Sequence, residues 1–127
     1  MQIVANNKKA FFEYFILEKI EAGIRLTGSE VKSLRTGKVS IKEAYAETKK
    51  GQLFLINADI SNYDKAASYS KIESKRVRKL LVHKKEISKL QGKIEKEGMT
   101  IIPLKIYFNK KGIAKIEIAI AKGKKLY

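Results

Sequence analysis

Residues that could perform acid–base, nucleophilic or metal chemistry are scarce in this chain. There is no cysteine, so thiol catalysis, thiolate metal sites and disulfide bonds are excluded. His83 is the single histidine, and its position just before a helical pattern favours a place at a helix start over a catalytic base. Asp59 and Asp64 are the only aspartates, which leaves no evident carboxylate cluster for two-metal phosphoryl transfer. We therefore expect a binding protein and not an enzyme, with no catalytic residues, no metal site and no cofactor.

The chemistry that the chain does offer is electrostatic, because its net charge is +15 over 127 residues. Residues 1–70 hold 11 basic and 8 acidic side chains (11 − 8 = +3), whereas residues 71–127 hold 17 and 5 (17 − 5 = +12). A chain this basic and this lopsided predicts a polyanionic partner, with nucleic acid as the first choice. An anionic membrane is a weaker alternative, because no basic stretch carries the broad apolar face that enters lipid. The other alternative is that the positive charge only keeps the protein soluble and has no specific partner.

Length and hydropathy predict one domain, spanning residues 1–127. A chain of this size can bury roughly two-thirds of the surface that it exposes when unfolded, so it needs no disulfide or metal for stability. No apolar run approaches the roughly 18 residues of a membrane span, and the start MQIVANNKK lacks the apolar core of a signal peptide. We expect a cytoplasmic protein with no membrane partner.

The elements that must position the charges are mostly strands. FFEYFIL (11–17) is apolar on both faces and predicts a buried strand, paired with GIRLT (23–27). Two hairpins are expected where KKG recurs, at 49–51 and at 110–112, because glycine supplies the positive φ of a short loop. Pro103 cannot donate to a ladder, so it predicts a sheet edge or a strand start.

The last strand, IAKIEIAIA (113–121), alternates with period two. This alternation predicts that the three isoleucines point into the core while the intervening side chains point out. The inward set is Ile116, Ile118 and Ile120, and the outward set is Lys115, Glu117 and Ala119.

The segment GIRLTGSEVKSLRTGKV (23–39) changes from strand spacing to helical spacing. Thr27 is the expected N-cap, with Glu30 as its capping-box partner and Gly37 just past the helix end. Val31 and Leu34 then pack inward, while Lys32 and Arg35 point outward.

A second helix is predicted for HKKEISKLQGKIEKEG (83–98), ending at Gly98. Its apolar side carries Ile87, Leu90 and Ile94, and its opposite side carries Lys85, Lys89, Lys93 and Lys96. The polar segment that begins SNYDKAASYSK (61–71) is expected to be an exposed connection.

The fold class predicted from these patterns is mainly β with about two to three short α-helices. Antiparallel strands with a helix covering one end favour a small closed or half-closed β-barrel, and barrels of this kind commonly bind nucleic acid. A flat β-sandwich remains an alternative.

Four blocks of the sequence, in order, carry a resemblance to a known family. They are EAGIRLTGSEVKSLRTGKVSIKEAYAE (21–47), RVRKLLVHKKEISKL (76–90), GMTIIPLKIYF (98–108) and IAIAKGKKLY (118–127). These blocks resemble the small protein B (SmpB) family, the transfer-messenger RNA (tmRNA) binding proteins of bacteria. The resemblance extends from about Asn7 to Tyr127.

The resemblance implies both a fold and a function. The family's fold is an antiparallel β-barrel related to the OB-fold. Its members bind the tRNA-like domain of tmRNA, as one copy of a monomer per RNA, and bring it to stalled ribosomes. There the protein takes the place of the missing anticodon stem during trans-translation. The partners implied are therefore tmRNA and the ribosome.

The same resemblance implies which residues bind RNA. Glu21 would be a polar anchor that accepts a hydrogen bond from a base edge or a ribose. The lysines around Gly123 would clamp the RNA backbone, because glycine permits close approach and lysines neutralise phosphates. The full expected set is Asn7, Lys8, Lys9, Glu21, Gly23, Lys32, Arg35, Arg76, Arg78, Lys79, Lys122, Gly123, Lys124 and Lys125.

Most of the aromatic side chains lie in dense apolar segments, and we expect these to be core residues. They are Phe11, Phe12, Tyr14, Phe15, Phe54, Tyr107 and Phe108. Without an exposed row of stacking rings, recognition of a folded RNA by its shape is favoured over single-strand binding. The rival interpretation is a ribosomal or cold-shock-like RNA-binding protein.

The family's chains usually continue beyond GKKLY with a long basic tail, which this sequence lacks. We expect this 127-residue form to bind RNA but to support trans-translation poorly.

Overall fold

The computed structural model describes residues 1–61 and 73–124. Its described part is mainly β with three short helices, as predicted. The elements in chain order are β1 (Gln2–Asn6), α1 (Ala10–Glu13), β2 (Tyr14–Ile24), α2 (Gly28–Arg35), β3 (Val39–Ser40), β4 (Tyr45–Lys49), β5 (Gln52–Ile56), β6 (Asp59–Ile60), β7 (Arg78–Leu81), α3 (Lys84–Glu97), β8 (Thr100–Phe108) and β9 (Ala114–Gly123).

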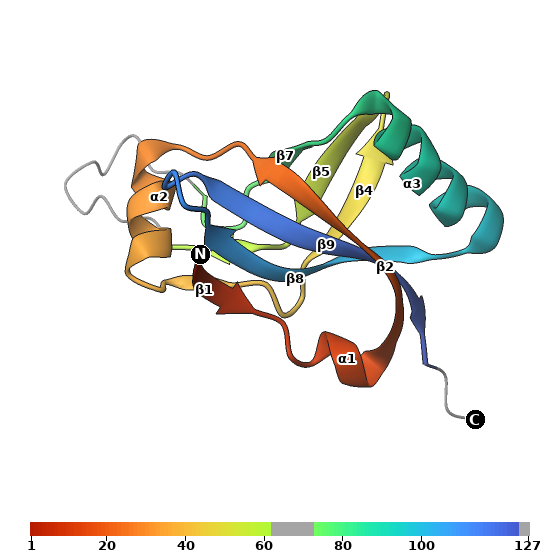
Figure 1. Ribbon diagram of the computed structural model, residues 1–127, viewed down its shortest axis with the longest axis horizontal. Coiled ribbons are helices and arrows are strands. Elements are labelled where there is room, and N and C mark those ends of the chain that lie inside the picture. The colour runs from red at the N-terminus through yellow and green to blue at the C-terminus, as the bar shows by residue number, and fades with distance from the viewer. Residues whose placement is uncertain (62–72, 125–127) are drawn as a thin grey trace.

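The main sheet closes on itself. Its strand order is β1-β8-β4-β5-β7-β2-β9, and β9 also pairs with β8, so the strands from β8 to β9 form a closed ring (Figure 1). Every pairing in it is antiparallel, and β1 lies beside β8 outside the ring. A separate two-stranded sheet joins β3 to β6. The predicted closed β architecture is confirmed, whereas the OB-fold relationship stays a prediction.

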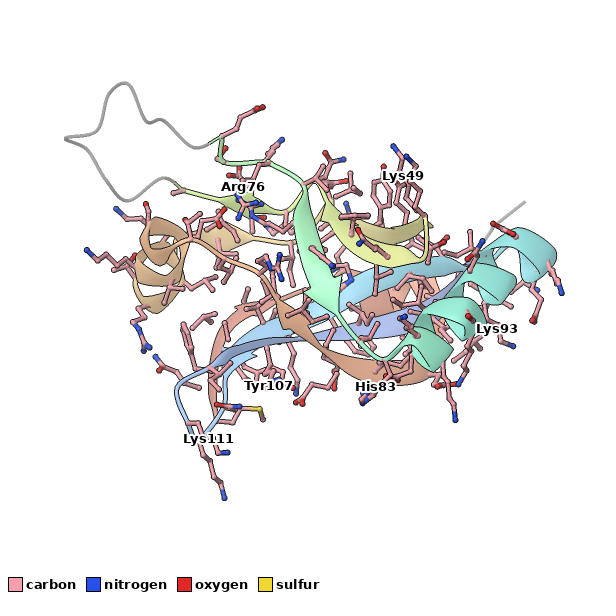
Figure 2. All side chains as sticks on the ribbon, turned by 90° about the horizontal axis from the view of Figure 1, so that it is seen from above. Lys49, Arg76, His83, Lys93, Tyr107 and Lys111 are labelled. Atoms are coloured by element: carbon pink, nitrogen blue, oxygen red, sulfur yellow. The ribbon has the colours of Figure 1, made fainter. Side chains whose placement is uncertain are left out.

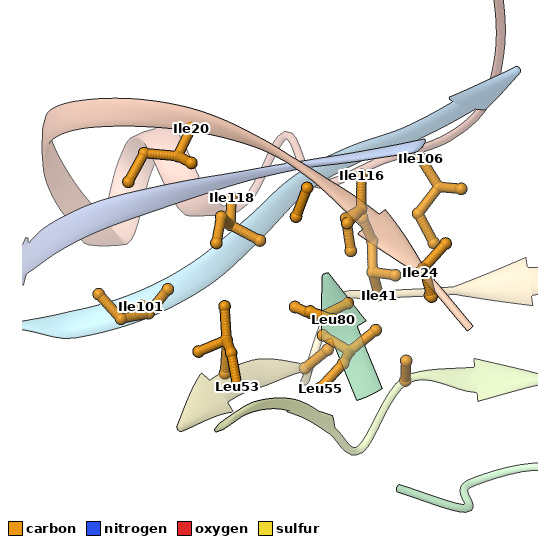
Figure 3. Close-up of a cluster of buried hydrophobic side chains, with 14 of the residues drawn as sticks. Ile20, Ile24, Ile41, Leu53, Leu55, Leu80, Ile101, Ile106, Ile116 and Ile118 are labelled. Carbon is orange, nitrogen blue, oxygen red and sulfur yellow. The ribbon is translucent and has the colours of Figure 1, made fainter. Parts of the chain in front are cut away.

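Apolar side chains fill the interior of the strand ring (Figure 3). Each strand contributes alternate residues, because successive side chains of a strand point to opposite faces. Side chains exposed to 1 % or less include Leu53, Leu55, Leu80, Ile101, Ile106, Ile116 and Ile118. Burying each such side chain contributes about 1.5–3 kcal/mol, so this core is the main source of stability.

Two helices lie at opposite ends of the strand ring, with α2 at one end and α3 at the other (Figure 1). In α2 the predicted capping box is present: Thr27 Oγ1 accepts from the amide of Glu30 at 3.2 Å, and Glu30 Oε1 accepts from the amide of Thr27 at 2.9 Å. Leu34 is fully buried and Val31 packs against the core, as expected.

The predicted second helix is α3, which ends at Gly98 in the left-handed conformation. His83 is its N-cap residue, in agreement with the predicted place at the helix start. Ile87 and Leu90 are buried and Ile94 packs against the core. Among the described residues, no helix is long and apolar enough to span a membrane.

Both predicted hairpins are confirmed, β4 with β5 and β8 with β9. In the first, Lys50 and Gly51 have φ values of 51° and 73°, the two positive φ angles of a tight hairpin turn.

Residues 11–17 do not form the predicted buried strand. Their first part belongs to α1, and β2 then runs without interruption from Tyr14 to Ile24, pairing with β9 and β7. The expected pairing of 11–17 with 23–27 is therefore wrong. A short run of apolar residues without alternation does not indicate whether the segment is a helix or a strand. It also does not indicate which of the side chains are buried.

The position of Pro103 is also a correction. It lies inside β8, where the register against β9 shifts between Pro103 and Lys105. On the other side, β8 changes partner from β1, at Lys105, to β4, at Ile101. The proline is neither at an edge nor at a strand start, but where the ladder is interrupted.

A second, smaller apolar cluster covers part of the outer face of β8 and β9. It joins Ala10, Ile102, Leu104, Ala119 and Ala121. Ala119 points outward as predicted but is fully buried, because the chain around α1 packs over it.

Candidate nucleic-acid interface

The outer face of β2, β9 and β8 carries a compact group of polar residues, here called the outer-face cluster. It consists of Glu21, Lys105, Tyr107, Lys115 and Glu117. These side chains point outward because their neighbours in each strand point into the core. The register brings them together: Glu21 lies opposite Glu117, Lys105 opposite Glu117, and Tyr107 opposite Lys115.

The Tyr107 hydroxyl donates a hydrogen bond to Glu21 Oε2 across β9. Tyr107 is only 6 % exposed, whereas Glu21 is exposed. Burial raises the pKa of Tyr107 above its ordinary value, and the hydrogen bond to Glu21 and the charge of Glu117 raise it further. The phenol is therefore a protonated donor at neutral pH. Lys105 Nζ lies 5.7 Å from the centroid of its aromatic ring.

Gly23 lies at the margin of this cluster. A Cβ at Gly23 would lie 3.2 Å from the Cβ of Leu81, a close contact that would push Leu81 away by a few tenths of an ångström. Leu81 is 46 % exposed at this margin. Gly23 was expected to bind RNA, and the structure provides a packing reason for a glycine at this position.

A second surface lies beside the first, around α1 and the start of β2. Phe11, Phe12 and Phe15 are 49 %, 80 % and 55 % exposed, so the expectation that these are core residues is wrong. The other members of this aromatic–lysine surface are Lys19, Lys122 and Lys124. The reason for disfavouring base stacking therefore no longer holds, because exposed aromatic rings can stack with unpaired bases.

Lysines lie against these rings. Lys124 Nζ is 5.0 Å from the ring centroid of Phe15 and donates to the carbonyl of Phe11 at 3.2 Å. Lys19 Nζ lies 5.9 Å from the ring centroid of Phe11. Lys19 is also two residues before Glu21 on the same face of β2, so it connects the two surfaces.

Asn7 does not lie on the surface, where it was expected. It is 5 % exposed, and its Nδ2 donates to the carbonyl of Pro103 at 3.0 Å. Its role is to hold the end of β1 against β8. Lys8 and Lys9 are exposed, and Lys9 contacts Glu43 at 3.3 Å.

Arg78 is a further correction, because its side chain is 0 % exposed. Its guanidinium donates to Glu30 Oε2 at 2.8 Å, to the carbonyl of Ala58 at 2.7 Å and to the carbonyl of Ser74 at 2.9 Å. It cannot contact RNA from this position. Its charge is matched inside the fold, as a buried charge must be.

Arg76 also binds Glu30, through contacts of 2.6 Å and 3.0 Å, and its side chain is 31 % exposed. Burial opposes ionisation of Glu30, but hydrogen bonds from Arg76, the Thr27 amide and Arg78 lower the pKa of its carboxyl. Lys79 is half-buried on β7. Figure 2 shows Arg76 and Tyr107 on opposite sides of the molecule in that view.

The remaining expected residues are on other parts of the surface. Lys32 and Arg35 are exposed on α2, and the Arg35 guanidinium lies 4.3 Å from the ring centroid of Phe108. Lys122, Gly123 and Lys124 are exposed at the end of β9. Lys125 lies outside the described residues, as do Asp64 and most of the connection that begins at Ser61.

The lysine side of α3 is partly neutralised. Lys89 pairs with Glu18 of β2, and Lys93 pairs with Glu97 at 3.1 Å. These pairs reduce the charge that this helix presents to a polyanion.

Sequence reasoning did not assign Lys19, Lys105, Tyr107 and Lys115 to the site. The alternation in the last two strands was the available signal for Lys105, Tyr107 and Lys115, since it places them on one outer face. Nothing in the sequence indicated the contact between Tyr107 and Glu21, which are separated by 86 residues. In residues 1–61 and 73–124, no group of histidine, aspartate and glutamate side chains could hold a metal ion.

The family model described as "SmpB protein" matches residues 4–127 of the chain. An SsrA-binding protein of Wolbachia pipientis subsp. Culex pipiens is 58 % identical over 127 residues, covering 100 % of this chain and 85 % of the relative. An SsrA-binding protein of Nitrobacter winogradskyi is 54 % identical over 127 residues, covering 100 % of this chain and 80 % of the relative.

A solved structure has a similar fold, with a TM-score of 0.77 and 49 % sequence identity. The match covers 96 % of this chain and 85 % of the chain in that structure, which is described as "tmRNA-SmpB: a journey to the center of the bacterial ribosome".

Proposed function

The chain belongs to the SmpB protein family, and from this premise we propose that it binds tmRNA, also called SsrA RNA, and acts with it at stalled ribosomes in trans-translation. The observation that carries the proposal is the extent of the similarity. Relatives that are SsrA-binding proteins match this chain from end to end at 54–58 % identity. Similarity confined to a short motif would be much weaker support for a shared function than this full-length similarity.

The surface features support RNA as the partner. The net charge of +15 favours association with phosphates, and affinity from such contacts falls steeply with salt. The outer-face cluster adds hydrogen-bonding groups that phosphate attraction alone does not require. A carboxylate such as Glu21 repels phosphates, so its partners in RNA are N–H and O–H donors on base edges and riboses.

We assign the folded tRNA-like domain of tmRNA to the outer-face cluster. The aromatic–lysine surface would take unpaired bases, which stack on exposed aromatic rings while lysines neutralise the adjacent phosphates. In this arrangement the protein stands in for the missing anticodon stem. One monomer would act per tmRNA, in the cytoplasm where ribosomes operate.

The proposed role is binding without catalysis. Two acidic residues lie at the expected RNA surface: Glu21 accepts a hydrogen bond from Tyr107, and Glu117 lies opposite Glu21. Among the described residues, no group of side chains could hold a metal ion. The protein would contribute shape and charge, and the chemistry would belong to the ribosome and the RNA.

A second candidate is a general binder of single-stranded or ribosomal RNA. The observation that favours it is the exposure of Phe11, Phe12 and Phe15, since such rings stack with any base. This candidate predicts no preference for a tRNA-like fold.

Competitive binding at two salt concentrations separates the two candidates. The tRNA-like domain of tmRNA would be labelled, and single-stranded RNA and a generic duplex would be the competitors. A protein that neutralises 6–10 phosphates loses about 10³–10⁵ in affinity between 50 and 200 mM salt, so one condition is not sufficient. Preference for the tRNA-like domain that persists at 200 mM salt is the expected result. Equal competition by all three RNAs would contradict the proposed function and favour the general binder.

A further inference from the structure

Glu21 is an exposed carboxylate on a long side chain, yet one of its oxygens is held. Among the residues that the structure describes, Tyr107 is the one whose side chain donates a hydrogen bond to it. The two residues come from strands that do not pair directly here, since β9 lies between β2 and β8. Tyr107 therefore reaches over β9 to hold the Glu21 carboxylate above the sheet.

Tyr107 is itself rigidly placed. It is 6 % exposed, and its backbone is paired on both sides, with Ile3 of β1 and Lys115 of β9. The Lys105 Nζ lies 5.7 Å from its ring centroid. A tyrosine side chain has only two torsions to fix, whereas a glutamate side chain has three. A buried phenol can therefore order an exposed carboxylate at little entropic cost of its own.

The position of Glu117 makes this contact more important. Glu117 lies directly opposite Glu21 on β9, and like charges directly opposite each other in a sheet repel. Without the Tyr107 hydroxyl, Glu21 would turn away from Glu117 towards solvent. With it, Oε2 is held over the sheet.

We propose that Tyr107 is a positioning residue for RNA recognition, which holds the Glu21 carboxylate in the one orientation that accepts hydrogen bonds from N–H or O–H groups of the bound RNA. This inference rests on the proposed function and deepens it. Ordering a flexible side chain before binding removes an entropic cost that the complex would otherwise bear. Tyr107 itself does not touch the RNA in this account.

The test is a double-mutant cycle with the full 127-residue chain and the labelled tRNA-like domain of tmRNA. The variants are Tyr107→Phe, Glu21→Gln and the double variant, each measured at two salt concentrations. Tyr107→Phe is expected to weaken binding about 3–10-fold, the effect of losing one hydrogen bond, without changing the salt dependence. In the Glu21→Gln background the same substitution is expected to have a smaller effect, because a glutamine oxygen accepts a weaker hydrogen bond from the phenol than a carboxylate does.

Matched controls are available on β4, outside the outer-face cluster. Tyr45→Phe removes a hydroxyl from a side chain that is 37 % exposed, and Glu47→Gln removes an exposed carboxylate. Both are expected to bind the RNA as tightly as the parent chain. Thermal unfolding of each variant confirms that it is folded.

Three outcomes would overturn the inference. If Tyr107→Phe binds the RNA as tightly as the Tyr45→Phe control while Glu21→Gln binds more weakly, Tyr107 has no positioning role. An equal loss from Tyr107→Phe with and without the Glu21 carboxylate would indicate a merely structural tyrosine. Unchanged binding by Glu21→Gln would remove Glu21 from the interface. In all three the parent chain still prefers the tRNA-like domain, whereas loss of that preference is the separate failure of the proposed function.

Discussion

Glu30, in the first turn of α2, accepts a 2.8 Å hydrogen bond from the guanidinium of Arg78 on β7, and both side chains are buried. The two residues are 48 positions apart in the sequence. Arg76 binds the same carboxylate from the partly exposed side. This triad fixes the helix at one end of the strand ring to the neighbouring strand.

Glu30→Gln is expected to destabilise the fold by about 3–5 kcal/mol, because it leaves the buried charge of Arg78 without its counterion. The measurement is the free energy of unfolding from urea titration at pH 7. Glu43→Gln is the matched control, since Glu43 pairs with Lys9 at a side-chain exposure of 77 % and such pairs contribute about 0–1 kcal/mol. Equal stabilities of the two variants would contradict the role of the triad.

The pH dependence of stability provides a second test of Glu30. Its pKa is lowered in the folded state from an ordinary value of 4.5, so the folded protein favours the ionised carboxylate. A lowered pKa contributes stability that is present above the unfolded value and lost as the pH falls through the folded value. The stability difference between the parent chain and Glu30→Gln should therefore shrink below pH 4.5. A difference that stays constant down to pH 3 would contradict the assignment.

Phe12→Ala should weaken binding of a single-stranded oligonucleotide about 5–150-fold, since stacking contributes about 1–3 kcal/mol per base. Stability should change by no more than about 0.5 kcal/mol, because Phe12 is 80 % exposed. Phe12→Tyr is the conservative control and should retain binding, because it keeps the aromatic ring. Fluorescence anisotropy measures the affinity. An unaffected Phe12→Ala variant would show that unpaired bases do not stack on this ring.

Lys124→Gln should reduce the slope of log affinity against log salt by about 0.7–0.9, the effect of one lost phosphate contact. Lys124 is exposed beside the Phe15 ring, where a phosphate could reach it. Lys93→Gln on α3 is the control, because Lys93 already pairs with Glu97. The same single-stranded oligonucleotide is titrated at four salt concentrations. Equal slopes for Lys124→Gln and the parent chain would place the phosphates elsewhere.

The parts of the fold that were predictable depend on local signals. The capping box at Thr27 and Glu30, the helix end at Gly98 and the hairpin turn at Gly51 are each specified by residues a few positions apart. The isoleucines of β9 point inward as their alternation indicates. In such elements the local preference and the tertiary structure agree.

The parts that were not predictable depend on contacts between distant residues. Phe11 and Phe12 are as apolar as any core residue, and only the path of the chain around α1 leaves them exposed. Arg78 has the character of a surface charge, and only the fold brings Glu30 to it. Asn7 has the character of an exposed polar residue, and only the fold brings β8 beside it. The charge and hydropathy of a side chain indicate what kind of group it will contact. They do not indicate which distant residue supplies that group.

The central claim is that the tRNA-like domain of tmRNA binds the outer face of β2, β8 and β9. Lysine footprinting by mass spectrometry, with and without this RNA, tests it most directly. The account predicts protection of Lys19, Lys105 and Lys115 from acylation, with unchanged labelling of the exposed control residues Lys49 and Lys96. Protection of Lys49 or Lys96 while Lys105 and Lys115 react as in the free protein would contradict it.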